Sequence, residues 1–330
     1  MEQSTTWYSG KDNHKKNTFT ENTETKQHKF NLELLDQEFP NNRTLDEIFY
    51  DHVSNRQTKY IEVLYSGGLD SECVLNSCLN NKLPVRAITM RLLRTGFPIN
   101  THDLYYSERF CRQRNIEQIF VDLNLDSFFE NGDYIEILRP YKITMLHVAT
   151  HFWLFKQCSG FPILGGDYSW PQVNQPEQLK NATGFLRTMY LKKRVISPHK
   201  HAFAVYDKFL YDNSINGIGN MLSHSAESNL FFLKRHLDLV ENDPNHIYDG
   251  DDFKITFLKR DLLKSIGFSD VEHRMKSYGW DTLHPLVLDT KPYLQKLSQE
   301  FGNTTSSVTW NQQIADLLGV DPSTNYSYGK

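Results

Sequence analysis

The sequence predicts an α/β fold, an open parallel sheet followed by a mainly helical C-terminal lobe. Short apolar runs alternate with segments of helical spacing between residues 60 and 164, and the alternation fades from about residue 170. Glycine-rich turns follow the first and the fourth apolar run. Strands that alternate with helices form parallel sheets with right-handed crossovers, whose ligands bind beyond the carboxyl ends of the strands.

The elements of the sheet region follow one another at short intervals. We expect strands at the apolar runs of residues 60–65, 85–90, 118–122 and 162–164. The helix after the first strand carries apolar side chains at helical spacing, and further helices are expected at residues 103–114 and about 142–158. This topology predicts that the two glycine-rich turns meet at one edge of the sheet.

The regions before and after the sheet region lack its alternation of strands and helices. Residues 1–30 are polar and predict a loose arm, whereas residues 31–58 predict helices, one of which starts near Thr44. Helical patterns return at residues 225–240 and 258–266, and again near 310–318. The C-terminal half is therefore expected to be a mainly helical or mixed lobe.

The turn Ser66-Gly67-Gly68-Leu69-Asp70-Ser71 lies between the first strand and its helix. Backbone N–H groups at the positive end of a helix dipole form a natural seat for phosphate, and glycines let the backbone approach the anion closely. Ser66 and Ser71 add hydroxyl donors. Asp70 would repel a phosphate unless a cation sits between them, so the turn predicts Mg²⁺ bound at Asp70.

This string resembles the PP-loop, SGGxDS, of the N-type ATP pyrophosphatases, and the chain looks most similar to the synthetase domain of asparagine synthetase. It is not a Walker A loop, because Gly-Lys-Ser/Thr is absent. The resemblance implies an adenine nucleotide alpha hydrolase-like, Rossmann-type sheet that binds ATP with Mg²⁺. It also implies cleavage of ATP between the α and β phosphates, which leaves an adenylated substrate and pyrophosphate.

The same resemblance suggests further site residues. Gly165-Gly166-Asp167 is similar to a glycine-acidic turn after the fourth strand of asparagine synthetases, which would make Asp167 a second metal or pyrophosphate-side carboxylate. A plain strand-end turn is the alternative. The family holds adenine at the end of the second strand, so Thr89, Met90 and Arg91 become adenine or ribose candidates; for Met90 the alternative is ordinary core.

The densest basic stretch contains Arg187, Lys192, Lys193 and Arg194. Cleavage of the α–β bond builds charge on the departing pyrophosphate, which Lys and Arg stabilise in a closed site. Lys192 and Arg194 are therefore our catalytic candidates beside Asp70. A solvated charge run and a nucleic-acid patch remain alternatives.

Composition excludes other classes of site. The net charge is −4, so no global basic field draws in nucleic acid. The four cysteines form no C-x-x-C motif, and we expect them reduced and buried, as in a cytoplasmic protein. No apolar run has the length of a membrane span.

His147 and His151 are spaced as zinc ligands on a helix, but a third ligand is lacking and a packed pair is expected.

These observations divide the chain into an N-terminal arm and helices at residues 1–58, a PP-loop nucleotide-binding domain at 59–168 and an acceptor-substrate and lid region at 169–330. The leading function is an AMP-forming ligase for an amino acid-like small molecule. Because Glu2 stands where glutamine-dependent synthetases have a nucleophilic cysteine, the nitrogen is expected from ammonia, another amine or a separate subunit. The alternatives are a tRNA or DNA base-modifying enzyme and a non-catalytic ATP- or AMP-binding module; an oligomer is left open.

Overall fold

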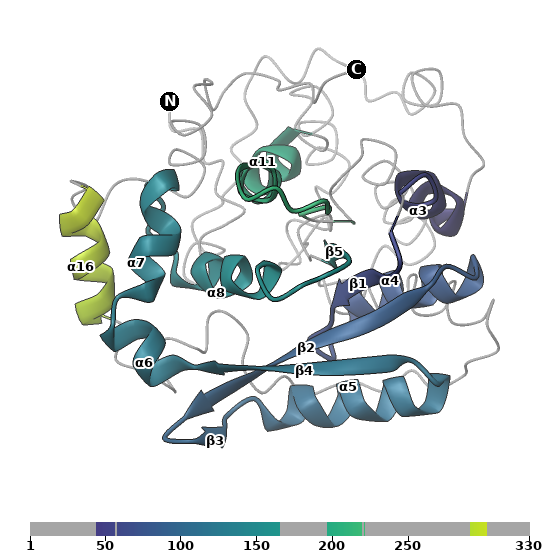
Figure 1. Ribbon diagram of the computed structural model, residues 1–330, viewed down its shortest axis with the longest axis horizontal. Coiled ribbons are helices and arrows are strands. Elements are labelled where there is room, and N and C mark those ends of the chain that lie inside the picture. The colour runs from purple at the N-terminus through teal and green to yellow at the C-terminus, as the bar shows by residue number, and fades with distance from the viewer. Residues whose placement is uncertain (1–43, 57, 166–196, 220, 222–290, 302–330) are drawn as a thin grey trace, which may run out of the picture.

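The computed structural model describes residues 44–56, 58–165, 197–219, 221 and 291–301. Within these ranges it contains a five-stranded sheet with helices on both faces (Figure 1). The strands are β1 (Ile61–Leu64), β2 (Val85–Arg94), β3 (Phe97–Pro98), β4 (Glu117–Asn124) and β5 (Phe161–Leu164). The helices are α3 (Leu45–Val53), α4 (Leu69–Asn80), α5 (Thr101–Arg114), α6 (Leu125–Glu130), α7 (Asp133–Leu138), α8 (Leu146–Phe155), α11 (Ser197–Asp212) and α16 (Lys291–Phe301).

The strand order explains where a ligand would bind. β1 pairs in parallel with β2 on one side and with β5 on the other, and β4 pairs in parallel with the far side of β2. Among the described strands, only the two-residue β3 is antiparallel, as a hairpin with β2. The chain therefore builds outward from β1 in one direction and then returns to the other side with β5. Such a reversal creates a crevice at the carboxyl ends of the two strands that flank it.

Two hydrophobic clusters fill the two faces of the sheet. One unites α3, α4 and α5 with strand residues such as Val63 and Ala87. The other unites α6, α7, α8, α11 and α16 with residues such as Leu64 and Ile88. Figure 1 shows α5 and α8 on opposite sides of the sheet. Neighbouring residues of one strand thus serve opposite cores, as the period of two in a strand requires.

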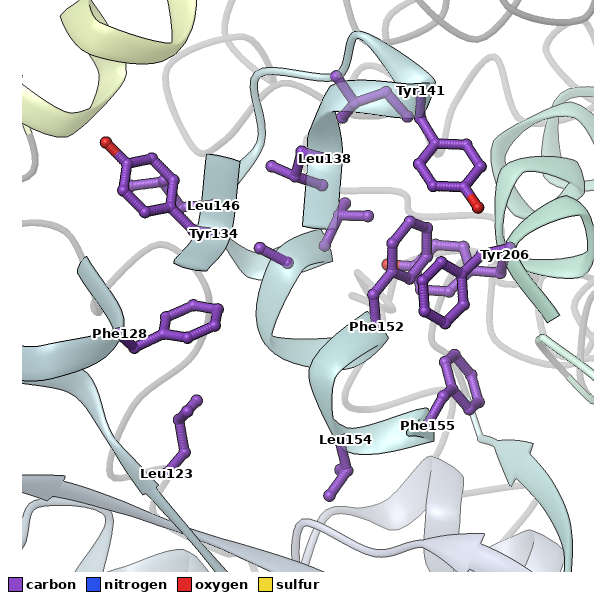
Figure 2. Close-up of a cluster of buried hydrophobic side chains, with 14 of the residues drawn as sticks. Leu123, Phe128, Tyr134, Leu138, Tyr141, Leu146, Phe152, Leu154, Phe155 and Tyr206 are labelled. Atoms are coloured by element: carbon purple, nitrogen blue, oxygen red, sulfur yellow. The ribbon is translucent and has the colours of Figure 1, made fainter. Parts of the chain in front are cut away.

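The second cluster contains a group of aromatic rings in mutual contact. Figure 2 shows Phe152 of α8 between Tyr141 and Tyr206, with ring centroids 5.3 Å away in both pairs. Phe152 also stacks on Phe209 of α11 at 4.0 Å. These contacts join α11, which comes late in the chain, to the sheet domain through α8.

A buried carboxylate ties the strands together at the amino end of the sheet. Glu62 of β1 is fully buried and accepts hydrogen bonds from Arg86 Nε at 2.7 Å and from the Ser159 and Gly160 N–H groups at 2.8 and 2.7 Å. Buried charges are tolerated when they are paired in this way. Glu62 therefore holds the start of β5 beside β1 and β2.

The predicted α/β fold with a parallel sheet is confirmed, and so is a helix start at Thr44, whose side chain forms a capping box with Glu47. Two predicted boundaries differ most from those in the structure. The second strand continues past Met90 to Arg94 because β3 and β4 extend its pairing. The helix expected from about residue 142 begins at Leu146, because Lys142 has a left-handed φ of 52°.

α11 and α16 lie in the C-terminal lobe that the sequence predicts to be mainly helical, at positions for which no individual helix is predicted. The helices expected at residues 225–240, 258–266 and 310–318 lie outside the described residues.

Candidate functional site

Gly165, the described residue of the second glycine-rich turn, touches the first turn at the reversal of strand order. A Cβ on Gly165, directly after β5, would lie 2.6 Å from Ser71 N, 2.7 Å from Ser71 Cα and 2.9 Å from the carbonyl carbon of Asp70. These distances leave no room for a side chain, so Gly165 packs directly on the first turn of α4. The predicted meeting of the turns after the first and fourth strands is confirmed for Gly165, the residue of the second turn that the structure describes.

The loop between β1 and α4 requires glycine at Gly67. Its φ is +74°, and a Cβ there would lie 2.5 Å from the carbonyl oxygen of Asp103 in α5. Both the left-handed backbone and the close approach exclude other residues. Gly67 therefore fixes the loop against the first turn of α5.

The first turn of α4 offers backbone N–H groups at this edge. Gly68 is the N-cap residue and provides no side-chain cap, and the first intrahelical bond runs from Glu72 N to Gly68 O at 3.1 Å. The helix dipole concentrates positive potential at such a terminus. Ser66 is exposed beside it, and Ser71 is buried with its hydroxyl donating to Gly68 O at 3.2 Å. The turn has the backbone of an anion site.

Two carboxylates of the first turn differ in their surroundings. Glu72 is buried and accepts a hydrogen bond from the Tyr65 hydroxyl at 3.2 Å, which gives it a structural role. Asp70 is partly exposed at the same terminus. Within the described ranges, no three His, Cys, Asp or Glu side chains are placed to hold a metal ion. A single carboxylate still fits Mg²⁺, which takes few protein ligands together with substrate phosphates.

The adenine candidates lie beside this loop, although β2 does not end there. The pairing of β1 with β2 ends at Leu64 and Ile88, after which the Tyr65 N–H donates to Ile88 O at 2.8 Å. Thr89 is buried, and its hydroxyl accepts a hydrogen bond from Gln118 at 2.8 Å. Its side chain is thus committed to the protein interior.

Asn100 is a residue of this region that sequence reasoning missed. Its side chain donates to Met90 O at 2.9 Å and accepts from Leu92 N at 3.0 Å, so it continues the pairing of β2 where β1 has ended. Asn100 precedes α5 but makes no capping bond to it. An Asn before a helix signals a cap, and nothing in the sequence shows that it turns to the strand instead. Asn100 bonds the Met90 carbonyl and the Leu92 N–H on the side of β2 that faces β1. The Met90 N–H is thereby left as the backbone donor on that side.

Other candidates are placed elsewhere. Arg91 forms an ion pair with Asp122, with Nη2 2.9 Å from Oδ2, on an exposed part of β2 and β4. Gly166, Asp167, Arg187 and the basic residues Lys192, Lys193 and Arg194 lie outside the described residues.

The histidine pair of α8 is packed, as expected. His147 and His151 are both nine-tenths buried, with ring centroids 6.0 Å apart, and His151 Nδ1 lies 3.0 Å from the Tyr206 hydroxyl. Burial and the neighbouring His147 hold the pKa of His151 well below its usual value. His151 is therefore neutral at physiological pH and packs in the protein interior.

All four cysteines are free, and three of them are buried. Burial, with a contribution from nearby carboxylates, raises the pKa of Cys78 and of Cys111 to about 12. Thiols of this kind are poor nucleophiles. Their expected burial is confirmed for Cys73, Cys78 and Cys111, whereas Cys158 is partly exposed.

No protein-family model and no curated protein matches this chain. It is similar to the structure of NMN synthetase from Francisella tularensis, at 12% identity and a TM-score of 0.33, over 88% of this chain and 94% of that one. It is similar to the U34-tRNA thiolase NcsA from Methanococcus maripaludis, at 13% identity and a TM-score of 0.29, over 80% and 92% of the two chains.

A third similar structure is the NH3-dependent NAD synthetase from Campylobacter jejuni subsp. jejuni NCTC 11168, at 14% identity and a TM-score of 0.28, over 67% of this chain and 99% of that one. At these scores the function has to be argued from the site itself. Among the described helices, none is both long and apolar enough to cross a membrane.

Proposed function

We propose that this chain is an N-type ATP pyrophosphatase that acts as an AMP-forming ligase, similar to the synthetase domain of asparagine synthetase. A carboxylate or carbonyl oxygen of an acceptor attacks the α phosphorus of ATP. The bond to the β-phosphate oxygen breaks, and pyrophosphate leaves. An amine then attacks the adenylated carbon and displaces AMP, so that an amide forms.

The observation that carries this proposal is the contact of Gly165 with the first turn of α4. It brings Gly165 at the end of β5 onto the amide-rich loop of β1, where the order of the described strands reverses. A phosphate chain bound there meets the N–H groups of the loop and the dipole of α4 together. An ordinary surface turn has no need of this close packing.

Different residues of the loop would bind the phosphates and the metal ion. Ser66 and the backbone N–H groups around Gly67 and Gly68 would bind the phosphates, since the chain there is shaped for close approach. Asp70 would hold Mg²⁺, which when bound neutralises phosphate charge. With its negative charge balanced, Asp70 then stands beside the phosphates without repelling them.

The part of β2 that lies beside the loop, beyond its pairing with β1, supports recognition of adenine. The Met90 N–H is a donor for a ring nitrogen, and Met90 O retains a second lone pair beside the bond from Asn100. Adenine presents an acceptor next to an amino donor, which matches this pair of backbone groups. Guanine presents the opposite order and does not match.

The remaining roles belong to residues outside the described part of the chain. We assign Gly166 and Asp167 to the pyrophosphate side of the site. Lys192 and Arg194 would stabilise the charge of the leaving pyrophosphate. An amino acid-like acceptor would bind in the region of residues 169–330.

The test is ATP–pyrophosphate exchange with a panel of amino acids and other carboxylates. We expect exchange with one class of acceptor and its loss in the variant Asp70→Asn. The control is Asp133→Asn, which changes an exposed carboxylate in the first turn of α7 and should leave exchange unchanged. Tight ATP binding without exchange for any acceptor would refute the ligase and favour a nucleotide-binding module.

A further inference from the structure

In the part of the chain that the structure describes, β4 forms an edge of the sheet. It pairs with β2 on one side only, at the margin of the sheet in Figure 1. The opposite margin is covered, because Ile218 N donates to Pro162 O and Met221 N to Leu164 O, both at 2.9 Å along β5. Among the described residues no backbone group pairs with the outer side of β4.

The register shows which groups of β4 face outward. The Ile88 carbonyl faces β1, so alternation turns the backbone groups of Thr89 and Arg91 toward β4. Thr89 lies beside Phe120, and in a parallel ladder it bonds the residues on either side of its neighbour. The N–H and C=O groups of Phe120, and likewise of Gln118 and Asp122, therefore point away from the sheet.

The two carboxylates of this edge are paired with β2, Glu117 with Arg86 and Asp122 with Arg91. Over its eight residues β4 contains no proline, lysine or arginine. Ile119 and Val121 are partly exposed while they pack against the second cluster, and Phe120 is partly exposed beside Arg91. An edge strand of this length, without proline, lysine or arginine, can pair with a further strand.

We propose that β4 pairs antiparallel with β4 of a second copy of this chain, about a twofold axis at Phe120. The two five-stranded sheets then form one continuous sheet of ten strands. The inference concerns the sheet alone and does not depend on the proposed function. A symmetric pair uses the same patch on both copies, so the strand must be complementary to itself.

This register makes β4 self-complementary. Phe120 lies opposite Phe120 of the second copy, and Gln118 lies opposite Asp122, so every outward N–H meets an outward C=O. Ile119 lies opposite Val121 on the other face, which joins apolar to apolar side chains. A twofold axis at Val121 would instead set Phe120 against Asp122. The sequence of the edge therefore favours the axis at Phe120.

The predicted contact is small. A strand of eight residues is about 27 Å long, and a pair of strands alone buries less than a standard interface. We therefore expect a weak dimer, which forms at about micromolar concentrations of the chain.

Amide hydrogen exchange at low and high protein concentration tests the pairing residue by residue. We expect exchange at Gln118, Phe120 and Asp122 to slow by about tenfold or more as the dimer forms. Exchange at Ile119 and Val121, whose N–H groups bond β2, should not depend on concentration. Exchange at the outward positions that is equally fast, or equally slow, at all concentrations would overturn the proposal.

A charge-swap experiment tests the axis at Phe120. By sedimentation, Phe120→Lys and Phe120→Glu should each weaken the dimer by about tenfold or more, because like charges then face each other. An equal mixture of the two variants should recover the dimer. Tyr211→Lys, at a position 85% exposed on α11, is the control and should dimerise like the unmodified chain. A monomeric mixture of folded variants, or dimers in both single variants, would contradict the proposal.

Discussion

Replacement of Gly165 by alanine should separate the two turns that build the site. The added Cβ would lie 2.6 Å from Ser71 N, whereas an ordinary contact begins at 3.4 Å, so the backbone must move by about 0.8 Å (3.4 minus 2.6). The atoms in the way are main-chain atoms of a helix, which cannot rotate aside. Overpacking of this kind costs about 1–3 kcal/mol of stability.

The same movement displaces the N–H groups at the start of α4. Loss of one hydrogen bond to a charged phosphate costs about 1.5–3 kcal/mol, so Gly165→Ala should weaken ATP binding by about tenfold to a hundredfold. Calorimetric titration with ATP, together with thermal unfolding, measures both effects.

Gly96→Ala provides the matched control. Gly96 has a φ of +82° and open space around it, so alanine there costs about 1–2 kcal/mol by backbone strain alone. It should lower stability to a similar extent and leave ATP affinity unchanged. An ATP affinity of Gly165→Ala within twofold of the unmodified chain would refute the reasoning.

Three further predictions concern stability. Glu62→Ala removes the main ionic partner of Arg86, whose side chain is 14% exposed, and should cost about 3–5 kcal/mol in urea unfolding, with a smaller loss for Glu62→Gln; equal losses would show that charge is irrelevant there. His151 has a pKa below its ordinary 6.5 in the folded chain, so the unfolded chain protonates first and stability should fall as pH drops below 6.5. When the free energy of unfolding is measured from pH 7.5 to 5, His151→Gln should lose less stability than the unmodified chain. The same dependence of stability on pH in both proteins would contradict this cause. Cys78 has a pKa raised to about 12 from 9.0, so stability should fall as pH rises past about 9, and Cys78→Ala should lessen that fall; an identical alkaline profile would refute it.

The site could be predicted from the sequence where local rules and topology agree. Gly67 and Gly68 mark the turn, apolar runs mark the strands, and right-handed crossovers bring Gly165 to the same edge. The close contact of Gly165 with Ser71 is the outcome of those rules. Nothing in the sequence indicates how tight it is.

The features that could not be predicted from the sequence depend on tertiary contacts. The strand at Met90 continues because β4 pairs with it as far as Asn124, a partner that no local pattern identifies. Asn100 has the residue type of a helix cap, yet its amide binds the backbone of β2. The long apolar helix begins late because Lys142 adopts a left-handed conformation, which its sequence position does not reveal.

The central claim is that this site binds ATP and breaks the bond between its α and β phosphates. Phosphorus NMR of ATP incubated with the chain, Mg²⁺ and the acceptor found by exchange tests it directly. We predict AMP and pyrophosphate as the products, and neither from Asp70→Asn. Release of ADP and inorganic phosphate, or no binding of ATP at all, would contradict the account.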